Sequence, residues 1–327
     1  MPMLLAVDAG GTSTRAVALD NSGHAYGYGR TGGGNPTSVG IENAVTAIAE
    51  AAAQAGAGLP DHADSVAVLA MAGVQSSRFR EQVAAGLAAL GWARVVLSHD
   101  LLGMFHSGTY LREGYSLIAG TGTVAARIRD GRLDRVVGGK GWLLGDEGGG
   151  FWIGRRVARA VVAALDGRHP PTSLTGLVLN AMGIPPDTES PKDRARALAE
   201  LVPALYARQP VQLAEFAPLA FAVHDDPTAR RILVAASAAL ADLLAAVRVP
   251  DLAGPVIGGG SVLVRGLLAA PPELRAALVP WDTEVFPVAD GVVGACVLAL
   301  RSVDVRVDEA LFTRVHAEVA RVAHASP

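Results

Sequence analysis

Residues 7–20 have the sequence VDAGGTSTRAVALD, in which a carboxylate, two glycines and three hydroxyl side chains separate two short apolar runs. The apolar runs predict two strands, over residues 3–8 and 14–20, joined by the polar segment. A β-hairpin needs a turn of only two residues. The longer polar segment therefore indicates a surface that holds a ligand as well as a turn that reverses the chain.

The polar turn has the chemistry of a phosphate site. Exposed backbone N–H groups and hydroxyls in a turn form a concavity that binds anions. Asp8, at the end of the first strand, can hold a Mg²⁺ ion through water, because Mg²⁺ takes few carboxylates and keeps its waters. Taken alone, the segment is also typical of an ordinary polar hairpin. The residues expected to contact phosphate are Gly10, Gly11, Thr12 and Ser13.

The pattern of these first strands recurs later in the chain. Residues 115–139 again give an apolar strand, a Gly/Thr turn, a second strand, a hairpin turn and a third strand. The repeat distance is close to the length of one domain. We therefore expect an α/β protein of two related domains, 1–114 and 115–327, each with a central mixed sheet and with a cleft between them. A final helix, expected over 307–323, can pack back on the first domain.

The composition excludes several classes of protein. The chain has 327 residues, of which 50% are hydrophobic and 18% charged, as in a compact folded protein. Its net charge of −3 gives no reason to expect a nucleic-acid or membrane partner. The N-terminus lacks the basic region of a signal peptide, and the most apolar stretch, ILVAASAALADLLAAV, is too short to span a bilayer. We therefore expect a cytoplasmic protein.

Cys296 is the only cysteine in the sequence. One thiol excludes an internal disulfide and a cysteine-based zinc site. A [4Fe–4S] cluster normally takes four thiolates, which even a dimer of this chain could not supply. The surrounding GVVGACVLAL indicates a buried small hydrophobic residue.

Two further glycine-rich turns accompany the first. AGTGTVA at 119–125 occupies the equivalent place in the repeat, and IGGGSVL at 257–263 follows a third apolar run. The segment 254–264 is expected to form a strand, a glycine turn and a resumed strand. The sequence contains neither a Walker P-loop nor a dinucleotide-binding fingerprint. Three such turns favour a nucleotide site in a cleft between the domains.

The three turns, in this order, resemble the phosphate-1, phosphate-2 and adenosine motifs of the superfamily of actin, heat-shock ATPases and sugar kinases. GGKGWLLGDEGGGFWIGR at 138–155 closely resembles the N-acetylglucosamine kinase branch of the BadF/BadG/BcrA/BcrD ATPase family. The resemblance covers nearly the whole chain. It implies two ribonuclease-H-like domains, ATP and Mg²⁺ as cofactors, and phosphorylation of an amino sugar, with the 6-hydroxyl of N-acetyl-D-glucosamine as the first candidate.

The resemblance also assigns roles to individual positions. Asp100, which ends VVLSHD, falls where the family places the base that takes the proton of the sugar hydroxyl. Asp100 could instead be the N-cap of the following helix, and His99 is a weaker candidate base. The implied sugar-binding residues are Asn35, Asp100, Gly139, Lys140, Gly141 and Asp146. The implied nucleotide-binding residues after the first turn are Gly120, Thr121, Gly122, Gly259, Gly260 and Ser261.

Local roles compete with some of these assignments. Asn35 precedes a proline and suits a turn, while Asp146 and Glu147 suit the start of a helix near Gly150. The sequence also departs from the family. Lys140 stands where the family commonly has Trp, which leaves an acidic or unacetylated sugar open.

Two more departures concern the nucleotide. Asp225 replaces a usual Gly near the expected adenine position. Ser13 stands where relatives often carry Lys, so Mg²⁺ or another basic residue must neutralise the phosphates.

Other functions stay open on the sequence alone. The substrate could be glucosamine, N-acetylmannosamine, N-acetylmuramate or glucose. An activator ATPase of a radical dehydratase would share the phosphate turns but needs cluster-binding cysteines, and a sugar-sensing regulator would keep the fold without turnover. We expect a homodimer.

Overall fold

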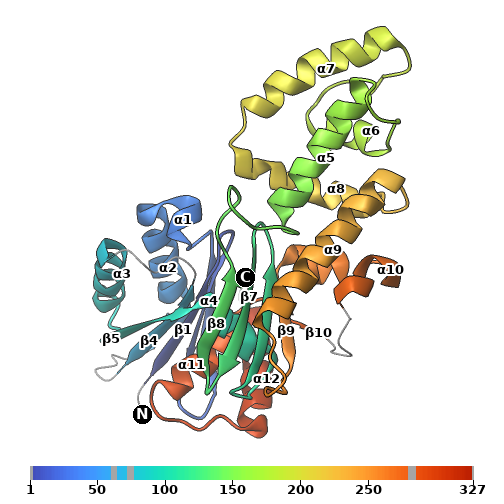
Figure 1. Cartoon of the computed structure of the whole chain (residues 1–327). Helices are drawn as coiled ribbons and strands as arrows, with labels where there is room; N and C mark the ends of the chain where they lie inside the picture. Colours follow the sequence, from blue (N-terminus) through green and yellow to red (C-terminus); the bar gives the residue numbers. More distant parts are fainter. Residues whose placement is uncertain (1–2, 60–64, 72–76, 279–284, 326–327) are drawn as a thin grey trace.

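The computed structural model describes residues 3–59, 65–71, 77–278 and 285–325. Two five-stranded sheets form its framework, with the strand orders β3-β2-β1-β4-β5 and β8-β7-β6-β9-β10 (Figure 1). The strands are β1 (Leu4–Ala9), β2 (Thr14–Leu19), β3 (Ala25–Thr31), β4 (Val66–Met71), β5 (Arg94–His99), β6 (Gly114–Ala119), β7 (Thr123–Arg129), β8 (Arg132–Gly138), β9 (Val256–Gly259) and β10 (Val285–Pro287).

The two sheets have the same topology. In each, the first strand pairs antiparallel with the second and parallel with the fourth, and the third strand lies at one edge. The prediction of an internal repeat and of two related mixed sheets is therefore confirmed. The sequence repeats because the same supersecondary unit is built twice.

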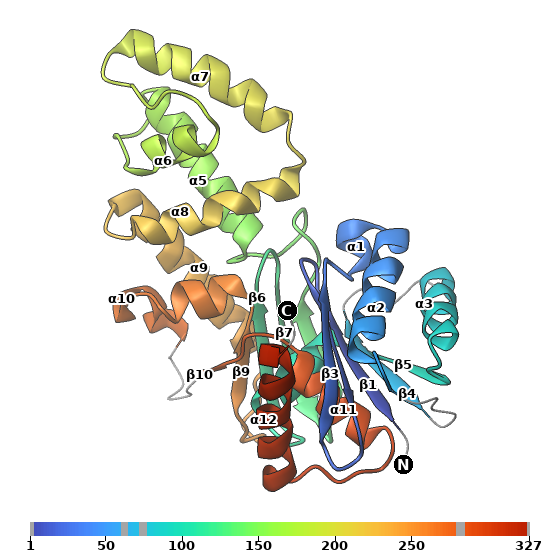
Figure 2. The same cartoon turned by 180° about the vertical axis from the view of Figure 1, so that it is seen from behind.

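Helices surround both sheets, and α5 to α9 extend beyond the second one (Figures 1 and 2). They are α1 (Pro36–Val39), α2 (Ile41–Ala55), α3 (Ser77–Ala89), α4 (Asp100–Gly108), α5 (Gly150–Leu165), α6 (Leu174–Ala181), α7 (Pro191–Tyr206), α8 (Ala217–Ala222), α9 (Pro227–Val247), α10 (Pro272–Arg275), α11 (Val292–Arg301) and α12 (Glu309–Ala325), with shorter helical turns at Pro210–Phe216, Val262–Leu267 and Ala276–Leu278.

Each face of the first sheet has its own core. Side chains alternate along a strand, so Leu5 and Val7 of β1 pack with α2 and α3, while Leu4 and Ala6 pack with α11 and α12. Asp8 continues the second set and lies on the α11 side. The C-terminal helices thus cover the first sheet, and Figure 2 shows α12 beside β3.

Two helices cross between the sheets. Helix α4 contacts both sheets, packing on β6 and β9 of the second and on β4 of the first, whereas α11 packs on β1 and β4 of the first. The two helices approach so closely that a Cβ on Gly294 would lie 1.8 Å from the Gly103 carbonyl oxygen. Cys296 on α11 is fully buried in the core that α11 and α12 form with the first sheet, as the sequence indicates for a small hydrophobic residue.

One expectation for the chain path is wrong. Residues after the third glycine turn form the helical segment Val262–Leu267, not a resumed strand. Val262, Leu263 and Leu267 are buried in the core of the second half, with a spacing that suits a helix. The division of the chain at residue 114 stays a prediction. Among the described residues, no helix has the length and apolar character needed to cross a membrane.

Candidate active site

The first glycine turn is held from both sides. Gly10 N donates to Ser13 O at 3.0 Å, which closes the turn. The backbone N–H groups of Gly34 and Asn35 donate to Gly10 O at 2.9 and 3.1 Å. Gly33 packs so near that a Cβ there would lie 2.4 Å from Gly11 O. The loop that carries Asn35 is therefore part of the same structure as the turn.

Charged side chains surround the base of this turn. Asp8 accepts a hydrogen bond from Gly291 N at 3.0 Å, so the start of α11 is fixed on the end of β1. Arg15 lies between acids, with Nε 3.1 Å from Asp290 Oδ2 and Nη1 3.8 Å from Asp8 Oδ2. Arg15 Nη1 also donates to Ser13 Oγ at 2.9 Å. The guanidinium is thus next to the turn that lacks a lysine.

Asp8 is in an environment that disfavours its negative charge. The pKa of Asp8 is raised to about 7, first by burial and then by the carboxylates of Asp290 and, to a smaller extent, Asp100, against the opposing effects of Gly291 N–H and Arg15. Negative charge has therefore accumulated where the sequence predicts a magnesium ion. A bound divalent cation would relieve it.

Asp100 opens α4 and faces the same region. His99 Nδ1 lies 2.6 Å from Asp100 Oδ1, and Leu101 N donates to the same oxygen at 2.8 Å. His99 is the N-cap residue of α4, so the alternative interpretation of Asp100 as the N-cap of this helix is wrong. Among the described residues, Asp100 Oδ2 accepts no hydrogen bond and stays available for a ligand.

The second glycine turn, between β6 and β7, is held by the segment 146–151. Gly120 N donates to Gly122 O at 3.0 Å, and Gly150 N donates to Gly120 O at 2.8 Å. Asp146 Oδ1 accepts from Thr123 N at 3.2 Å, and the carboxylate is so close to Gly122 that a Cβ there would lie 2.5 Å from Asp146 Oδ2. Asp146 therefore supports the turn, and Glu147 is exposed.

The third glycine turn lies directly on the second. Gly260 has φ +89°, and a Cβ there would lie 2.4 Å from the carbonyl carbon of Ala119. Only glycine fits this approach. In both views of the chain, the turns after β1 and β6 lie at the same end of the two sheets (Figures 1 and 2).

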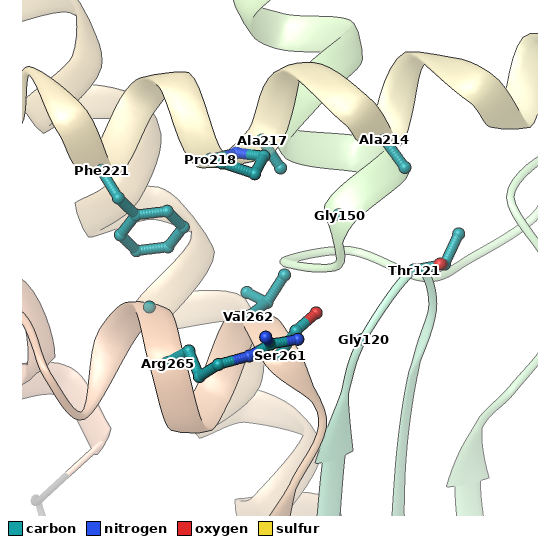
Figure 3. A pocket seen from close by; sticks show the side chains of 11 residues that line it. Gly120, Thr121, Gly150, Ala214, Ala217, Pro218, Phe221, Ser261, Val262 and Arg265 are labelled. Carbon is teal, nitrogen blue, oxygen red and sulfur yellow. The ribbon is translucent and has the colours of Figure 1, made fainter. Parts of the chain in front are cut away.

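A pocket of about 370 Å³ opens where the second and third turns meet (Figure 3). Gly120, Thr121 and Ser261 line its polar side. A Cβ on Gly266 would lie 2.6 Å from the Phe221 ring, so this glycine makes room for the aromatic side chain. The remaining lining residues are Gly150, Ala214, Ala217, Pro218, Val262 and Arg265.

The apolar wall of this pocket was not predicted as such. Asp225 was expected near the adenine, but it is exposed and does not line the pocket, whereas Phe221, four residues earlier, does. Arg265 and Pro218 were missed. Arg265 lies on the helical segment Val262–Leu267, and Pro218 lies on α8. These two elements meet through packing between parts of the chain that are far apart in the sequence.

The expected sugar-binding residues lie on two loops. Asn35 is half-buried, and its Oδ1 caps α1 by accepting from Thr37 N at 2.9 Å, so its amide group remains for a ligand. Gly139, Lys140 and Gly141 are exposed on the loop after β8. Gly139 N donates to Thr123 O at 2.8 Å, which ties this loop to the second turn.

Comparison with known proteins places this arrangement in a family. The BadF/BadG/BcrA/BcrD ATPase family matches residues 5–299 of the chain. The glucosamine kinase of Vibrio cholerae is 31% identical over 187 residues, which cover 55% of this chain and 61% of that protein. The match therefore spans less than two thirds of that relative.

Two other relatives are matched over more of their length. The N-acetyl-D-glucosamine kinase of Dictyostelium discoideum is 29% identical over 256 residues, covering 74% of this chain and 78% of that protein. A solved structure from Chromobacterium violaceum, provisionally assigned as an N-acetylglucosamine kinase, superposes with a TM-score of 0.72 and 28% identity. It covers 92% of this chain and 99% of that one. The expected two-domain α/β fold is confirmed by this likeness.

Proposed function

The chain belongs to the BadF/BadG/BcrA/BcrD ATPase family, and we propose that it is an ATP-dependent kinase that phosphorylates an amino sugar. Two observations carry the proposal: a pocket is bounded by two glycine turns, and one oxygen of the Asp100 carboxylate accepts no hydrogen bond from the residues that the structure describes. The relatives named above act on glucosamine and on N-acetyl-D-glucosamine. The 6-hydroxyl of N-acetyl-D-glucosamine is the first candidate acceptor.

The nucleotide fits the pocket by chemistry. Its apolar wall, with the Phe221 ring and Pro218, suits a flat aromatic base, and its polar side ends at the backbone of Gly120 and Thr121. Backbone N–H groups in such turns bind phosphate oxygens. The transferred phosphate would then point toward the first turn, Gly10 to Ser13.

The carboxylates at the first turn fit a magnesium ion. Mg²⁺ usually binds through one or two carboxylates, several waters and the substrate's phosphates. Asp8 has the accumulated negative charge that such an ion would balance, and in the described part of the chain no group of three or more His, Cys, Asp or Glu side chains forms a complete cage. When bound, the ion would spread the charge of the phosphates.

Asp100 and Arg15 then have separate tasks. Asp100 Oδ2 can accept the proton of the sugar hydroxyl, while His99 and the Leu101 N–H hold Oδ1 in place. Arg15 supplies positive charge beside the turn, which answers the absence of lysine at Ser13. The sugar itself would contact Asn35, Asp146 and the loop of Gly139 to Gly141.

The substitution Asp100→Asn tests this assignment. Loss of the base should lower sugar-dependent ADP release by about 100-fold or more, while binding of an ATP analogue is retained. Asp225→Asn is the matched control, because Asp225 is exposed and does not line the pocket. Near-normal turnover by Asp100→Asn would exclude Asp100 as the base.

The acceptor is identified by the same assay. ADP release should be compared across glucosamine, N-acetylglucosamine, N-acetylmannosamine, N-acetylmuramate and glucose. If a sugar binds but none of the five sugars causes ADP release, the result would instead support a sugar-sensing regulator. The activator ATPase is disfavoured because the single thiol, Cys296, is fully buried. The homodimer and the cytoplasmic location stay predictions.

A further inference from the structure

A second pocket, of about 800 Å³, lies beside α5 and shares no lining residue with the nucleotide pocket. The chain as a whole has a net charge of −3, yet this pocket is strongly basic. Its arginines come from α5, from the segment that follows it and from α9. They are Arg155, Arg156, Arg159, Arg168 and Arg231, and we call this site the arginine pocket.

Few acids balance the arginine pocket. Arg168 Nε pairs with Asp166 at 2.5 Å, and Glu147 is the acid on the lining. Among the described residues, none of the three α5 arginines has a carboxylate oxygen within 4.0 Å. Burial lowers the pKa of Arg156, and so do its neighbours Arg159 and Arg155. Like charges at this helical spacing destabilise a helix, so an anion bound there would stabilise the protein.

The walls of the arginine pocket are fixed. Asp226 caps α9 by accepting from Thr228 N at 2.8 Å, and the same carboxylate accepts from Thr172 Oγ1 and Ser173 N, both at 2.9 Å. The segment that carries Arg168 is therefore tied to the helix that carries Arg231. On α5, the Arg156 guanidinium lies 3.8 Å from the centre of the Trp152 ring.

We propose that the arginine pocket binds an anion that carries two or more phosphate groups. One guanidinium group can donate two parallel hydrogen bonds to the oxygens of a phosphate. Several guanidinium groups that line one pocket therefore match a ligand with several adjacent negative charges. The lining also includes three exposed apolar residues, Trp142, Leu143 and Leu144, which are 42%, 74% and 82% exposed. These residues precede Asp146, so the bound anion would contact the loop that supports the second glycine turn.

Inorganic pyrophosphate is the probe for this site. Calorimetric titration of pyrophosphate into the full chain, with no nucleotide present, should show a saturable site whose affinity falls with salt. Trp142 and Trp152 line the pocket, so the intrinsic fluorescence should change with the same affinity. Neither readout depends on kinase turnover.

The double variant Arg155→Gln/Arg159→Gln should weaken pyrophosphate binding by about tenfold or more, the fold-change that corresponds to one charge-assisted hydrogen bond. Arg135→Gln/Arg230→Gln removes the same charge from exposed positions outside the pocket and should leave binding unchanged. Three results overturn the proposal: unchanged pyrophosphate binding in Arg155→Gln/Arg159→Gln, equal weakening by both double variants, or the absence of a saturable signal.

Discussion

Arg15 Nε lies 3.1 Å from Asp290 Oδ2, so an ion pair joins the strand after the first glycine turn to the segment before α11. The Arg15 side chain is 20% exposed, and its Nη1 donates to Ser13 Oγ. Acids hold the guanidinium in place while part of it faces solvent beside the turn. A cation that is fixed before the reaction stabilises developing negative charge without having to reorganise.

Replacing Arg15 should therefore affect turnover more than folding. Arg15→Gln is expected to lower kcat/KM for ATP by about 100-fold, the effect typical of losing one electrostatic contact to a transition state. Arg15→Lys keeps the charge but loses the fork of the guanidinium, so it should recover only part of the activity. Coupled ADP-release kinetics and thermal melts on both variants separate the two effects. If Arg15→Gln changed the melting temperature alone, Arg15 would have a purely structural role.

The environment of Asp8 predicts a pH-dependent stability. The pKa of Asp8 is raised from 3.8 to about 7, first by burial and then by Asp290. Between these two values the folded chain holds a proton that the unfolded chain releases, so the contribution of Asp8 to stability is present below about pH 4 and is lost as the pH rises through about 7. Without magnesium, the free energy of unfolding should fall across this window.

Asp8→Asn isolates this effect from other titrating groups. Between pH 4.5 and pH 7.5, the melting temperature of the wild type should fall relative to that of Asp8→Asn. Magnesium with an ATP analogue should reduce that change, because a metal ion binds the deprotonated carboxylate. A difference that stays constant with pH would contradict the raised pKa.

Features encoded by neighbouring residues could be predicted from the sequence, whereas most contacts between distant parts of the chain could not. The glycine turns could be predicted because their signals lie within a few residues, and the topology followed from their repetition. The ion pair of Arg15 with Asp290 could not, since the partners lie at opposite ends of the chain. The proximity of Arg15 to Asp8 was accessible: Asp8 and Arg15 are partners in the antiparallel register of β1 and β2. Paired residues point to the same face of a sheet.

The close crossing of α4 and α11 predicts that adding one methyl group at Gly294 lowers the stability of the protein severely. Gly294→Ala would place a Cβ 1.8 Å from the Gly103 carbonyl oxygen, so the backbone of one helix must shift. Overpacking of this kind destabilises by about 1–3 kcal/mol, and backbone atoms cannot move aside as a side chain can. Urea unfolding should show a loss at or above the upper end of that range.

Gly176 provides the matched control for this experiment. It also lies in a helix, α6, but a Cβ there would meet no atom within 4 Å. Gly176→Ala should therefore stabilise the protein by about 0.5–1 kcal/mol, the helix preference of alanine over glycine. A similar loss from both substitutions would mean that the close approach of α4 and α11 does not limit the residue at position 294.

The aromatic wall of the nucleotide pocket gives the last prediction. Gly266→Ala would bring a Cβ within 2.6 Å of the Phe221 ring, and the ring, as the end of a movable side chain, should turn into the pocket. We expect KM for ATP to rise about tenfold, the equivalent of about 1.4 kcal/mol of lost binding, with kcat little changed. The smaller side chain in Gly266→Ala/Phe221→Leu should bring KM back toward the wild-type value. A double variant whose KM stays at the value of Gly266→Ala would show that displacement of the Phe221 ring is not what weakens ATP binding.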